Sequence, residues 1–258
     1  MIANENAFKK LSIVIPVFNE DRTLNQLVKT VLDVPLELEK EIIIVDDCSG
    51  DQTPAILLEL KNQHPELHVS RNEKNMGKGF SVARGIDHAS GDIILIQDAD
   101  LEYDPFEYPK LLGPILNGDA DVVYGSRFIT PASHPGFHFW HSLGNKMLTA
   151  FSNMMSHLKL SDMETCYKVF RASIIKPVKL DEKRFGVEPE ITFKLSRLKN
   201  LRLREVGISY RGRTYKEGKK IKWKDGVRVF YVLIKNVVLY QLKKEKHIFK
   251  NTGGNPAR

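Results

Sequence analysis

The amino-acid sequence predicts an α/β protein in which helices flank a central, mostly parallel sheet. In the first half of the chain, short apolar runs alternate with helix-like segments, which is the pattern of repeating βα units. Acidic side chains directly follow three of these runs, at the edge where open α/β sheets bind ligands. A basic amphipathic segment closes the chain. Together these features predict one large α/β domain followed by a C-terminal helix.

The first half of the chain is expected to alternate strands with helices in a regular order. Each strand is a short, nearly continuous apolar run, as in a parallel sheet that is buried on both faces. Pro54 suits the first turn of the helix after the second strand. The predicted elements are strand 11–16, helix 22–32, strand 41–45, helix 54–63, strand 67–70, a helix ending near 89, strand 92–96, helix 104–116 and strand 121–124. Right-handed crossovers would make neighbouring strands parallel.

The second half of the chain has a different pattern, with many aromatic and Met side chains. Their spacing over residues 131–160 suits one or two amphipathic helices, whose apolar face is either core or a surface for lipid. A strand is expected at 203–210, a basic loop at 211–224 and a basic amphipathic helix at 226–250. Residues 251–258 are expected to be disordered.

Composition and cysteine content predict a cytoplasmic globular protein. Hydrophobic residues make up 42% of the chain and charged residues 28%, which suits an ordinary core. Cys48 and Cys166 are too few and too distant for a disulfide framework or a cysteine metal site, so a reducing compartment fits best. The N-terminus lacks the apolar stretch of a signal peptide, and no run approaches the ~20 apolar residues of a spanning helix.

The net charge of +7 is unevenly distributed along the chain. Residues 1–193 contain 20 Lys and Arg against 28 Asp and Glu, whereas residues 194–258 contain 19 against 4. A segment this basic is suited to an anionic partner, such as nucleic acid, a phosphorylated ligand or an acidic membrane surface. A solvated basic face is the alternative.

The most informative motif is Asp98–Asp100 (Asp-Ala-Asp), which lies where the apolar strand 92–96 ends. Two carboxylates this close repel each other unless a cation neutralises them, and their oxygen ligands suit Mg²⁺ or Mn²⁺. A turn or helix-cap cluster is the alternative, because Asp favours both positions. The pattern recurs at residues 46–47 (Asp-Asp) and 19–20 (Asn-Glu). Three acidic strand ends favour a site for a cation or a polar ligand.

The better-known phosphate loops are missing from the sequence. No GxGxxG motif follows the first strand, and no GxxxxGK[ST] motif occurs anywhere. Residues 77–79 (Gly-Lys-Gly) are too short to be either motif. A dehydrogenase or a P-loop enzyme is therefore disfavoured.

Seven short motifs, in order along residues 10–245, resemble those of known glycosyltransferases. Four resemble motifs of the inverting family 2 glycosyltransferases, which have the GT-A fold: PVFNE at 16–20, VDDCSGD at 45–51, NMGKG at 75–79 and DAD at 98–100. Three resemble the subgroup that contains dolichyl-phosphate mannose synthase and bacterial polyprenyl-phosphate sugar transferases: GSR at 125–127, DMETCYK at 162–168 and FGVEPE at 185–190.

The resemblance implies transfer of a hexose, with inversion and with Mg²⁺ or Mn²⁺, from a nucleotide-diphosphate sugar of the GDP-mannose or UDP-glucose type. The implied acceptor is a polyprenyl or dolichyl phosphate, and a hydroxyl of a soluble glycan is the alternative. The implied domains are a polar extension (1–9), a catalytic domain with a donor half (10–128) and an acceptor half (129–225), and the C-terminal helix. This helix and the aromatic helices would attach the protein peripherally to an anionic membrane. The oligomeric state stays open.

The donor site implied by the resemblance lies at the acidic strand ends. Its nucleotide-binding residues would be Pro16, Phe18, Glu20 and Asp47, with Asp47 at the base or ribose. Its metal ligands would be Asp98, Asp100 and Glu102, with Ala99 in the same site; many synthases have Gln at the position of Glu102. The cations near the donor diphosphate would be Lys78, Arg213 and Lys219, the last two on a basic flap.

The acceptor site implied by the resemblance centres on Arg127, which would contact the acceptor phosphate. The acceptor-side helix would lie around Trp140, Ser142 and Asn145, with His141 near the expected place of a second phosphate-binding Arg. A phosphate acceptor is already an anionic nucleophile, so it needs positioning more than a general base. A hydroxyl acceptor would need a base, for which Asp162 and Glu188 are the candidates.

The basic residues also have purely structural interpretations. Arg127 could form a surface ion pair, residues 213–219 a solvated loop, and Lys78 could only cover the first turn of its helix. The basic C-terminal segment also raises the alternative of a nonenzymatic nucleic-acid-binding module. The acidic strand ends argue against that alternative, so no nucleic-acid partner is expected.

Overall fold

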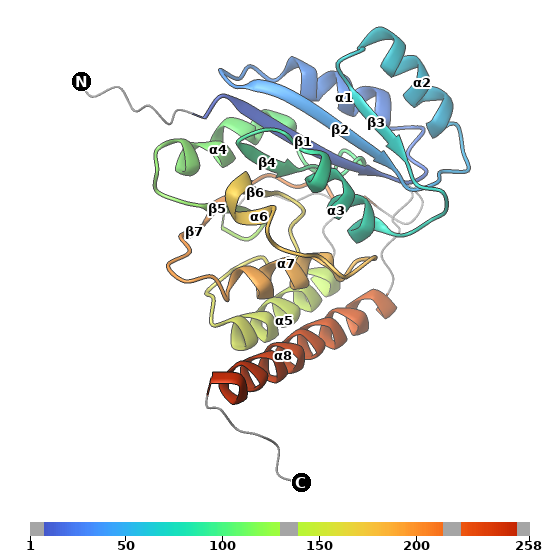
Figure 1. Ribbon diagram of the computed structural model, residues 1–258. Coiled ribbons are helices and arrows are strands. Elements are labelled where there is room, and N and C mark those ends of the chain that lie inside the picture. The colour runs from blue at the N-terminus through green and yellow to red at the C-terminus, as the bar shows by residue number, and fades with distance from the viewer. Residues whose placement is uncertain (1–7, 130–138, 214–222, 252–258) are drawn as a thin grey trace, which may run out of the picture.

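The strands in the described part of the chain form one seven-stranded sheet (Figure 1). The computed structural model describes residues 8–129, 139–213 and 223–251. The strands are β1 (Lys10–Val17), β2 (Glu39–Asp46), β3 (His68–Arg71), β4 (Ile93–Ile96), β5 (Val122–Ser126), β6 (Lys168–Arg171) and β7 (Leu203–Gly207). Their order in the sheet is β3-β2-β1-β4-β6-β5-β7. Only β6 runs antiparallel to its neighbours, so the predicted mostly parallel sheet is confirmed.

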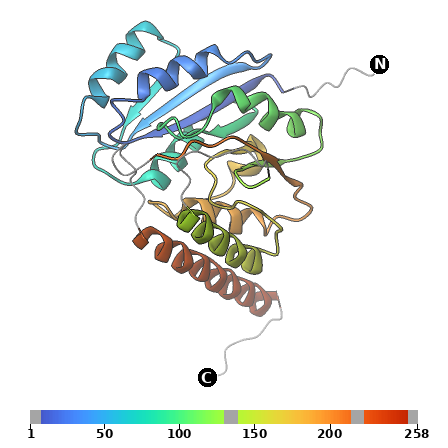
Figure 2. The same ribbon diagram turned by 180° about the vertical axis from the view of Figure 1, so that it is seen from behind.

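Helices flank this sheet, as the alternation of patterns predicts. They are α1 (Leu24–Asp33), α2 (Thr53–Gln63), α3 (Lys78–His88), η1 (Pro105–Glu107), α4 (Tyr108–Leu116), α5 (Phe139–Ser156), α6 (Ala172–Ile175), α7 (Val187–Leu195) and α8 (Trp223–Asn251). α3 packs against β1 and β2, while α5, α7 and α8 pack on one another. α8 lies outermost at the end of the molecule opposite α1 and α2 (Figures 1 and 2).

The central strands are held by aliphatic burial on both faces. All side chains of Ile42–Val45 and Ile93–Ile96 are buried, and burial of each such side chain stabilises the fold by about 1.5–3 kcal/mol. α3 approaches β1 closely at Gly85, where a Cβ atom would lie 2.3 Å from Cγ1 of Val14. This close approach fixes the position of α3, whose first residue is Lys78.

The antiparallel strand β6 has no counterpart among the predicted elements, which include nothing between residues 161 and 202. It is inserted between β4 and β5, with Phe170 paired to Ile94 on one side and to Val122 on the other. Its first residue, Lys168, is buried and donates hydrogen bonds to the carbonyls of Met163 and Thr165. A lysine at the start of a four-residue strand hides the apolar pattern that identifies buried strands.

The C-terminal elements differ from the prediction at their ends. β7 ends at Gly207 rather than at 210, because the following residues leave the sheet and run to the acidic strand ends. α8 begins at Trp223, inside the segment expected as a basic loop, and includes Asn251, expected as the start of a disordered tail. The remaining domain boundaries stay predictions.

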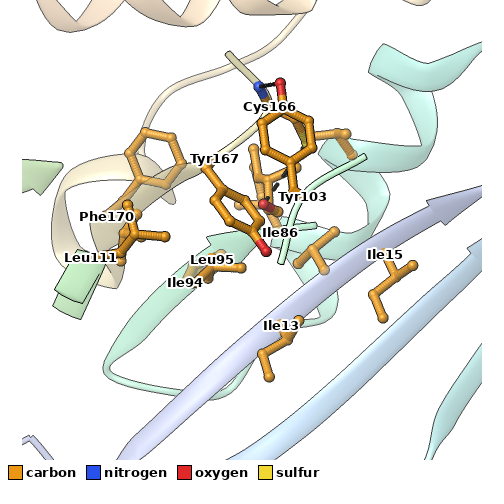
Figure 3. Close-up of a cluster of buried hydrophobic side chains, with 14 of the residues drawn as sticks. Ile13, Ile15, Ile86, Ile94, Leu95, Tyr103, Leu111, Cys166, Tyr167 and Phe170 are labelled. Atoms are coloured by element: carbon orange, nitrogen blue, oxygen red, sulfur yellow. Dashed lines mark hydrogen bonds between the residues drawn. The ribbon is translucent and has the colours of Figure 1, made fainter. Parts of the chain in front are cut away.

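A cluster of buried aromatic rings supports the loop that follows β4. Tyr108 and Tyr167 donate hydrogen bonds to Oε1 of Gln97, at 2.7 and 2.8 Å. The Tyr103 and Tyr167 rings lie 4.8 Å apart, and the backbone N–H of Cys166 donates to the Tyr103 hydroxyl at 3.1 Å (Figure 3). Rings and hydrogen bonds on both sides therefore hold residues 97–103, which include the acidic motif.

Candidate active site

The three acidic strand ends lie side by side at one edge of the sheet. β1 pairs in parallel with β2 on one side and with β4 on the other. The residue at the turn after each strand has positive φ: Asn19 at 50°, Cys48 at 61° and Leu101 at 59°. Left-handed backbone at non-glycine residues is uncommon and is found often at functional sites. The turns are also joined, because the backbone N–H of Asn19 donates to Oγ of Ser49 at 2.9 Å.

Asp98 is neutralised by a lysine from α3. Nζ of Lys78 lies 2.9 Å from Asp98 and 2.8 Å from Glu188, so one ammonium group bridges two carboxylates. Burial raises the pKa of Asp98, but the charge and hydrogen bond of Lys78, together with Cys166 and Lys168, hold that pKa below its usual value. The interpretation of Lys78 as a mere cover for the first helical turn is therefore wrong.

Asp100 lies among other carboxylates and faces Arg213. Nη2 of Arg213 is 3.0 Å from Asp100, and the same guanidinium makes two contacts with Glu20 at 3.0 and 3.2 Å. Burial raises the pKa of Asp100 to about 8, with further increases from Asp98 and Glu102, and Arg213 only partly opposes them. Among the described residues, the site therefore concentrates more negative charge than the cations beside it neutralise.

The segment after β7 closes over this cluster through Glu102. The backbone N–H of Arg213 donates to Oε1 of Glu102 at 2.7 Å, and the Tyr210 hydroxyl donates to Oε2 at 2.6 Å. The interpretation of Arg213 as part of a solvated loop is therefore wrong. Lys219, the second predicted cation of this flap, lies outside the described residues.

The predicted metal ligands are all oxygen donors at this edge, but they do not form a finished metal cage. Across residues 8–129, 139–213 and 223–251, no group of three or more His, Cys, Asp or Glu side chains is arranged to hold a metal ion. Asp98 faces Lys78, and Asp100 faces Arg213. The crowding that raises the pKa of Asp100 is nevertheless the kind that a divalent cation relieves. The donor set therefore fits Mg²⁺ or Mn²⁺ by its chemistry.

Asp47 positions the start of α3 rather than pointing into open space. Its carboxylate accepts hydrogen bonds from the backbone N–H of Met76 at 2.8 Å and of Gly77 at 2.7 Å, and from the side chain of Asn72 at 2.8 Å. These bonds hold the turn that delivers Lys78 to Asp98. Contact between Asp47 and a base or ribose stays a prediction.

The other predicted nucleotide residues lie at the end of β1 and beside β4. Pro16 and Phe18 are half-buried, and Glu20 is buried against Arg213. The carbonyl of Ala99 accepts a hydrogen bond from Oγ1 of Thr23 at 2.7 Å, which ties the acidic motif to the turn before α1. The structure thus brings these side chains to the same edge as Asp98 and Asp100.

The predicted acceptor residue Arg127 forms a buried, bidentate pair with Asp162. Nε and Nη2 of Arg127 lie 2.7 and 2.8 Å from the two oxygens of Asp162. Arg127 is 7% exposed and Asp162 is fully buried, so the interpretation as a surface ion pair is wrong. Burial opposes the charged form, but the nearby Asp162 raises the pKa of Arg127 well above its usual value. Asn145 of α5 donates to the same carboxylate at 3.3 Å.

Tyr210 connects the Arg127 pair to the donor carboxylates. Its ring centroid lies 5.0 Å from the guanidinium carbon of Arg127, and its hydroxyl donates to Glu102. The two predicted halves of the site are therefore in contact through one side chain. The side chains of Trp140 and His141 lie outside those described.

Glu164 is a candidate that the sequence analysis missed, although its motif DMETCYK was recognised. Its Oε1 is buried without a hydrogen-bond partner in the described part of the chain. Burial raises the pKa of Glu164 to about 8, with Glu188 adding to the increase and Lys168 and Arg127 opposing it. The motif marks the segment, but nothing in the sequence indicates that this Glu is buried. By contrast, Asp162 forms an ion pair with Arg127, and Glu188 forms one with Lys78.

A comparison with known protein families identifies the family of this chain. The model for glycosyl transferase family 2 matches residues 12–178. The chain belongs to glycosyl transferase family 2. This family 2 chain is 30% identical over 215 residues to dolichol-phosphate mannosyltransferase of Pyrococcus furiosus, covering 82% of the chain and 60% of that protein. It is 29% identical over 174 residues to dodecaprenyl-phosphate galacturonate synthase of Rhizobium johnstonii, covering 66% of the chain and 50% of that protein.

The chain therefore spans only about half to 60% of the length of these relatives. Among solved structures, glucosyl-3-phosphoglycerate synthase from Mycobacterium tuberculosis, in complex with Mn²⁺, UDP and phosphoglyceric acid, is similar with a TM-score of 0.67 at 19% identity. The match covers 89% of this family 2 chain and 78% of that chain. This similarity confirms the predicted GT-A-like fold.

Proposed function

We propose that the chain transfers a hexose from a nucleotide-diphosphate sugar to a polyprenyl phosphate, with inversion at the anomeric carbon. The observation that carries the proposal is the contact between two charge centres. Tyr210 joins the carboxylate group of Asp98, Asp100 and Glu102 to the buried Arg127–Asp162 pair. The family membership and the relatives that act on polyprenyl phosphates support the same assignment.

The donor half has to stabilise charge on a leaving diphosphate. Asp98 and Asp100, with Glu102 beside them, would hold a Mg²⁺ or Mn²⁺ ion, which when bound supplies positive charge to that diphosphate. Lys78 and Arg213 already lie against these carboxylates, at 2.9 and 3.0 Å, and add cationic side chains at the same place. Such preorganised charge acts on the transition state without having to rearrange.

The acceptor half has to position a phosphate. A phosphate oxygen attacks the anomeric carbon, the bond from that carbon to the diphosphate breaks, and the electron pair leaves with the nucleoside diphosphate. A single displacement of this kind inverts the anomeric centre. Arg127 would contact the acceptor phosphate, because it is a buried cation on this side and Asp162 and Tyr210 fix its orientation. The acceptor needs no general base.

The alternative acceptor is a hydroxyl group of a soluble glycan, which would need a base. The two base candidates from the sequence, Asp162 and Glu188, are both paired with cations. Glu164 has an unpartnered oxygen, but burial raises its pKa to about 8, so it would hold a proton at neutral pH. These observations favour the phosphate acceptor.

Exposed apolar side chains support peripheral contact with a membrane, where a polyprenyl phosphate would reside. Met147 and Met154 of α5 are 60% and 58% exposed, and Tyr231 of α8 is 60% exposed. Within the described segments, no helix has the length and apolar content needed to cross a bilayer. We assign these faces to the membrane interface, with the catalytic domain on its cytoplasmic side.

The test is a transfer assay with GDP-mannose and UDP-glucose in parallel, each with Mg²⁺ or Mn²⁺ and a short-chain polyprenyl phosphate. The expected product is a lipid-phosphate sugar of inverted anomeric configuration, formed from one of the two donors. Chelation of the divalent ion should stop its formation. Consumption of donor only with saccharide acceptors would instead establish the hydroxyl alternative.

A further inference from the structure

A hollow of about 450 Å³ lies where three segments meet outside the carboxylate cluster. Its walls come from residues 74–76 before α3, residues 181–184 before α7, and α8. None of the acidic residues of the proposed donor site lines this hollow. The hollow adjoins the turn at Met76 that Asp47 holds, but the proposed transfer reaction gives no role to its basic residues from 183–184 and α8.

The two acidic residues in the hollow are already neutralised. Glu182 is buried and lies 2.8 Å from Arg228 and 3.3 Å from Lys235, both of α8. Asp181 lies 2.7 Å from Lys194. Arg228 and Lys235, seven residues apart, project from the same side of α8. Neither carboxylate thus leaves an uncompensated negative charge in the hollow.

Three further cations line the hollow without such neutralisation. Lys74, Lys183 and Arg184 are exposed, and none has an ion-pair partner within the described parts of the chain. Together with the paired Arg228 and Lys235, they make the hollow strongly basic. A concave surface of this charge is suited to an anionic group, and phosphate accepts hydrogen bonds from several Lys and Arg side chains at once.

The neighbouring surface of α8 indicates where such a phosphate would come from. Val227, Tyr231, Ile234 and Val238 are 58%, 60%, 51% and 47% exposed and follow one another at helical spacing along one face. This apolar stripe lies next to Arg228 and Lys235 in the helix, so the basic hollow and an unpartnered apolar surface adjoin. A lipid offers both chemistries, a phosphate headgroup and acyl chains.

We propose that the hollow binds the phosphate headgroup of an anionic membrane lipid while the apolar stripe of α8 enters the acyl layer. The inference rests on the proposed membrane contact and assigns it a specific binding site. The segment 181–184 also packs on α3, because the carbonyl of Lys183 accepts a hydrogen bond from the backbone N–H of Phe80 at 3.1 Å. A headgroup bound here would hold the catalytic edge, which includes Lys78 of α3, at a defined height above the membrane.

The test measures binding of the full chain to vesicles of phosphatidylcholine with and without phosphatidylglycerol, at low salt. The double variant K183Q/R184Q removes two unpaired cations of the hollow. The matched control K29Q/K61Q removes two exposed cations from α1 and α2, at the opposite end of the molecule from α8 (Figure 1). The expected result is roughly 30-fold weaker binding of K183Q/R184Q to anionic vesicles, the effect of two charges lost at such a surface, and little change for the control.

Two further measurements separate the sources of the anion and guard against misfolding. The variant K183R/R184K keeps both charges and should bind like the parent chain. Inorganic phosphate and glycerol phosphate, each titrated into the vesicle assay, should displace the parent chain only at concentrations far above that of the lipid headgroups. Displacement at concentrations equal to the headgroups would identify a site for a free anion and overturn the lipid assignment.

If K183Q/R184Q and K29Q/K61Q weaken vesicle binding equally, only net charge matters and the proposal is overturned. The proposal is also overturned if the parent chain does not bind anionic vesicles. The assay contains neither nucleotide sugar nor polyprenyl phosphate. A negative result here therefore leaves the transfer reaction standing, and a failed transfer assay leaves this binding result standing.

Discussion

The two charge centres of the site solve the problem of buried charge in different ways. On the donor side, Asp100 sits among Asp98, Glu102 and Glu20, and its pKa is raised to about 8 because Arg213 does not offset burial and three like charges. On the acceptor side, Arg127 and Asp162 satisfy one another with two hydrogen bonds of 2.7 and 2.8 Å. In the described part of the chain, the donor carboxylates outnumber the cations that face them, whereas Arg127 and Asp162 neutralise each other.

This difference separates two functions of charge. A crowded carboxylate group is costly until a cation joins it, so it is a place for ligand binding rather than a source of stability. A buried bidentate pair is a fixed part of the structure, and removing one partner leaves the other uncompensated. Substitutions on the donor side should therefore affect turnover first, and substitutions in the acceptor pair should affect stability first.

The largest expected effect is on turnover after Asp100→Ala. Asp100 is a proposed ligand of the divalent ion, so its removal should lower the transfer rate by at least about 1,000-fold, because charge on the leaving diphosphate is no longer stabilised. The free energy of unfolding should stay unchanged or rise, since one of the crowded carboxylates is gone. Steady-state kinetics and urea unfolding check both, with the exposed Asp119→Ala as the control. Substantial remaining activity would show that Asp98–Asp100 is a turn cluster and not a metal site.

The next effect is on stability after Arg127→Ala. This change leaves Asp162 buried without its counter-ion and should lower the free energy of unfolding by about 3–5 kcal/mol. The double change R127M/D162L should recover most of that stability without recovering activity. Arg213→Ala is the donor-side counterpart, and urea denaturation should show a smaller loss. Equal losses of unfolding free energy for Arg127→Ala and Arg213→Ala would show that the two ion-pair clusters do not differ in their contribution to stability.

On the acceptor side, the buried Glu164 should make the free energy of unfolding depend on pH. The folded protein binds a proton on Glu164 up to a pKa of about 8, whereas the unfolded chain loses it near 4.5. Stability should therefore fall as pH rises through this window, and Glu164→Gln should not show that fall. At pH 8 the variant should be more stable by roughly 4 kcal/mol, and at pH 4.5 the two should nearly agree. Glu59→Gln, at an exposed position of α2, is the matched control for thermal unfolding across pH.

The smallest effect concerns the link between the sides. Tyr210→Phe keeps the ring beside Arg127 and removes the hydrogen bond to Glu102. It should cost about 1 kcal/mol of stability and lower turnover several-fold. A double-mutant cycle with Glu102→Gln measures the coupling, and strict additivity of the two changes would show that the sides act independently.

The parallel strands were predictable from sequence because their signal is local. The apolar runs of β1, β2 and β4 identify buried strands, and the acidic residues that follow identify the edge at which they end. β6 could not be found this way, because its four residues begin with Lys168 and become a strand only through pairing with β4 and β5. α7 was missed because its first turn contains Glu188 and Glu190, which look like surface residues but are buried.

The residues of the candidate site also differ in how far local sequence predicts them. The acidic residues were recognised from their position after strands and from the resemblance to family motifs. The resemblance also placed Lys78 and Arg213 in the donor site, but their ion pairs were not predicted. Arg213 reaches Asp100 across 113 positions in the chain, and Lys78 reaches both Asp98 and Glu188. Glu164 lies in a recognised motif, but its burial was not predictable, because it depends on residues far apart in the chain such as Arg127 and Glu188.

The place of β6 in the sheet also sets an order of assembly. β3, β2, β1 and β4 are neighbours and all lie before residue 97, so this half can pair as soon as it leaves the ribosome. β5 emerges next but finds no free neighbour, because both strands that flank it, β6 and β7, are made later. The donor edge can thus form before β5 has a strand to pair with. During synthesis the apolar strand Val122–Ser126 is therefore exposed to non-native pairing and aggregation.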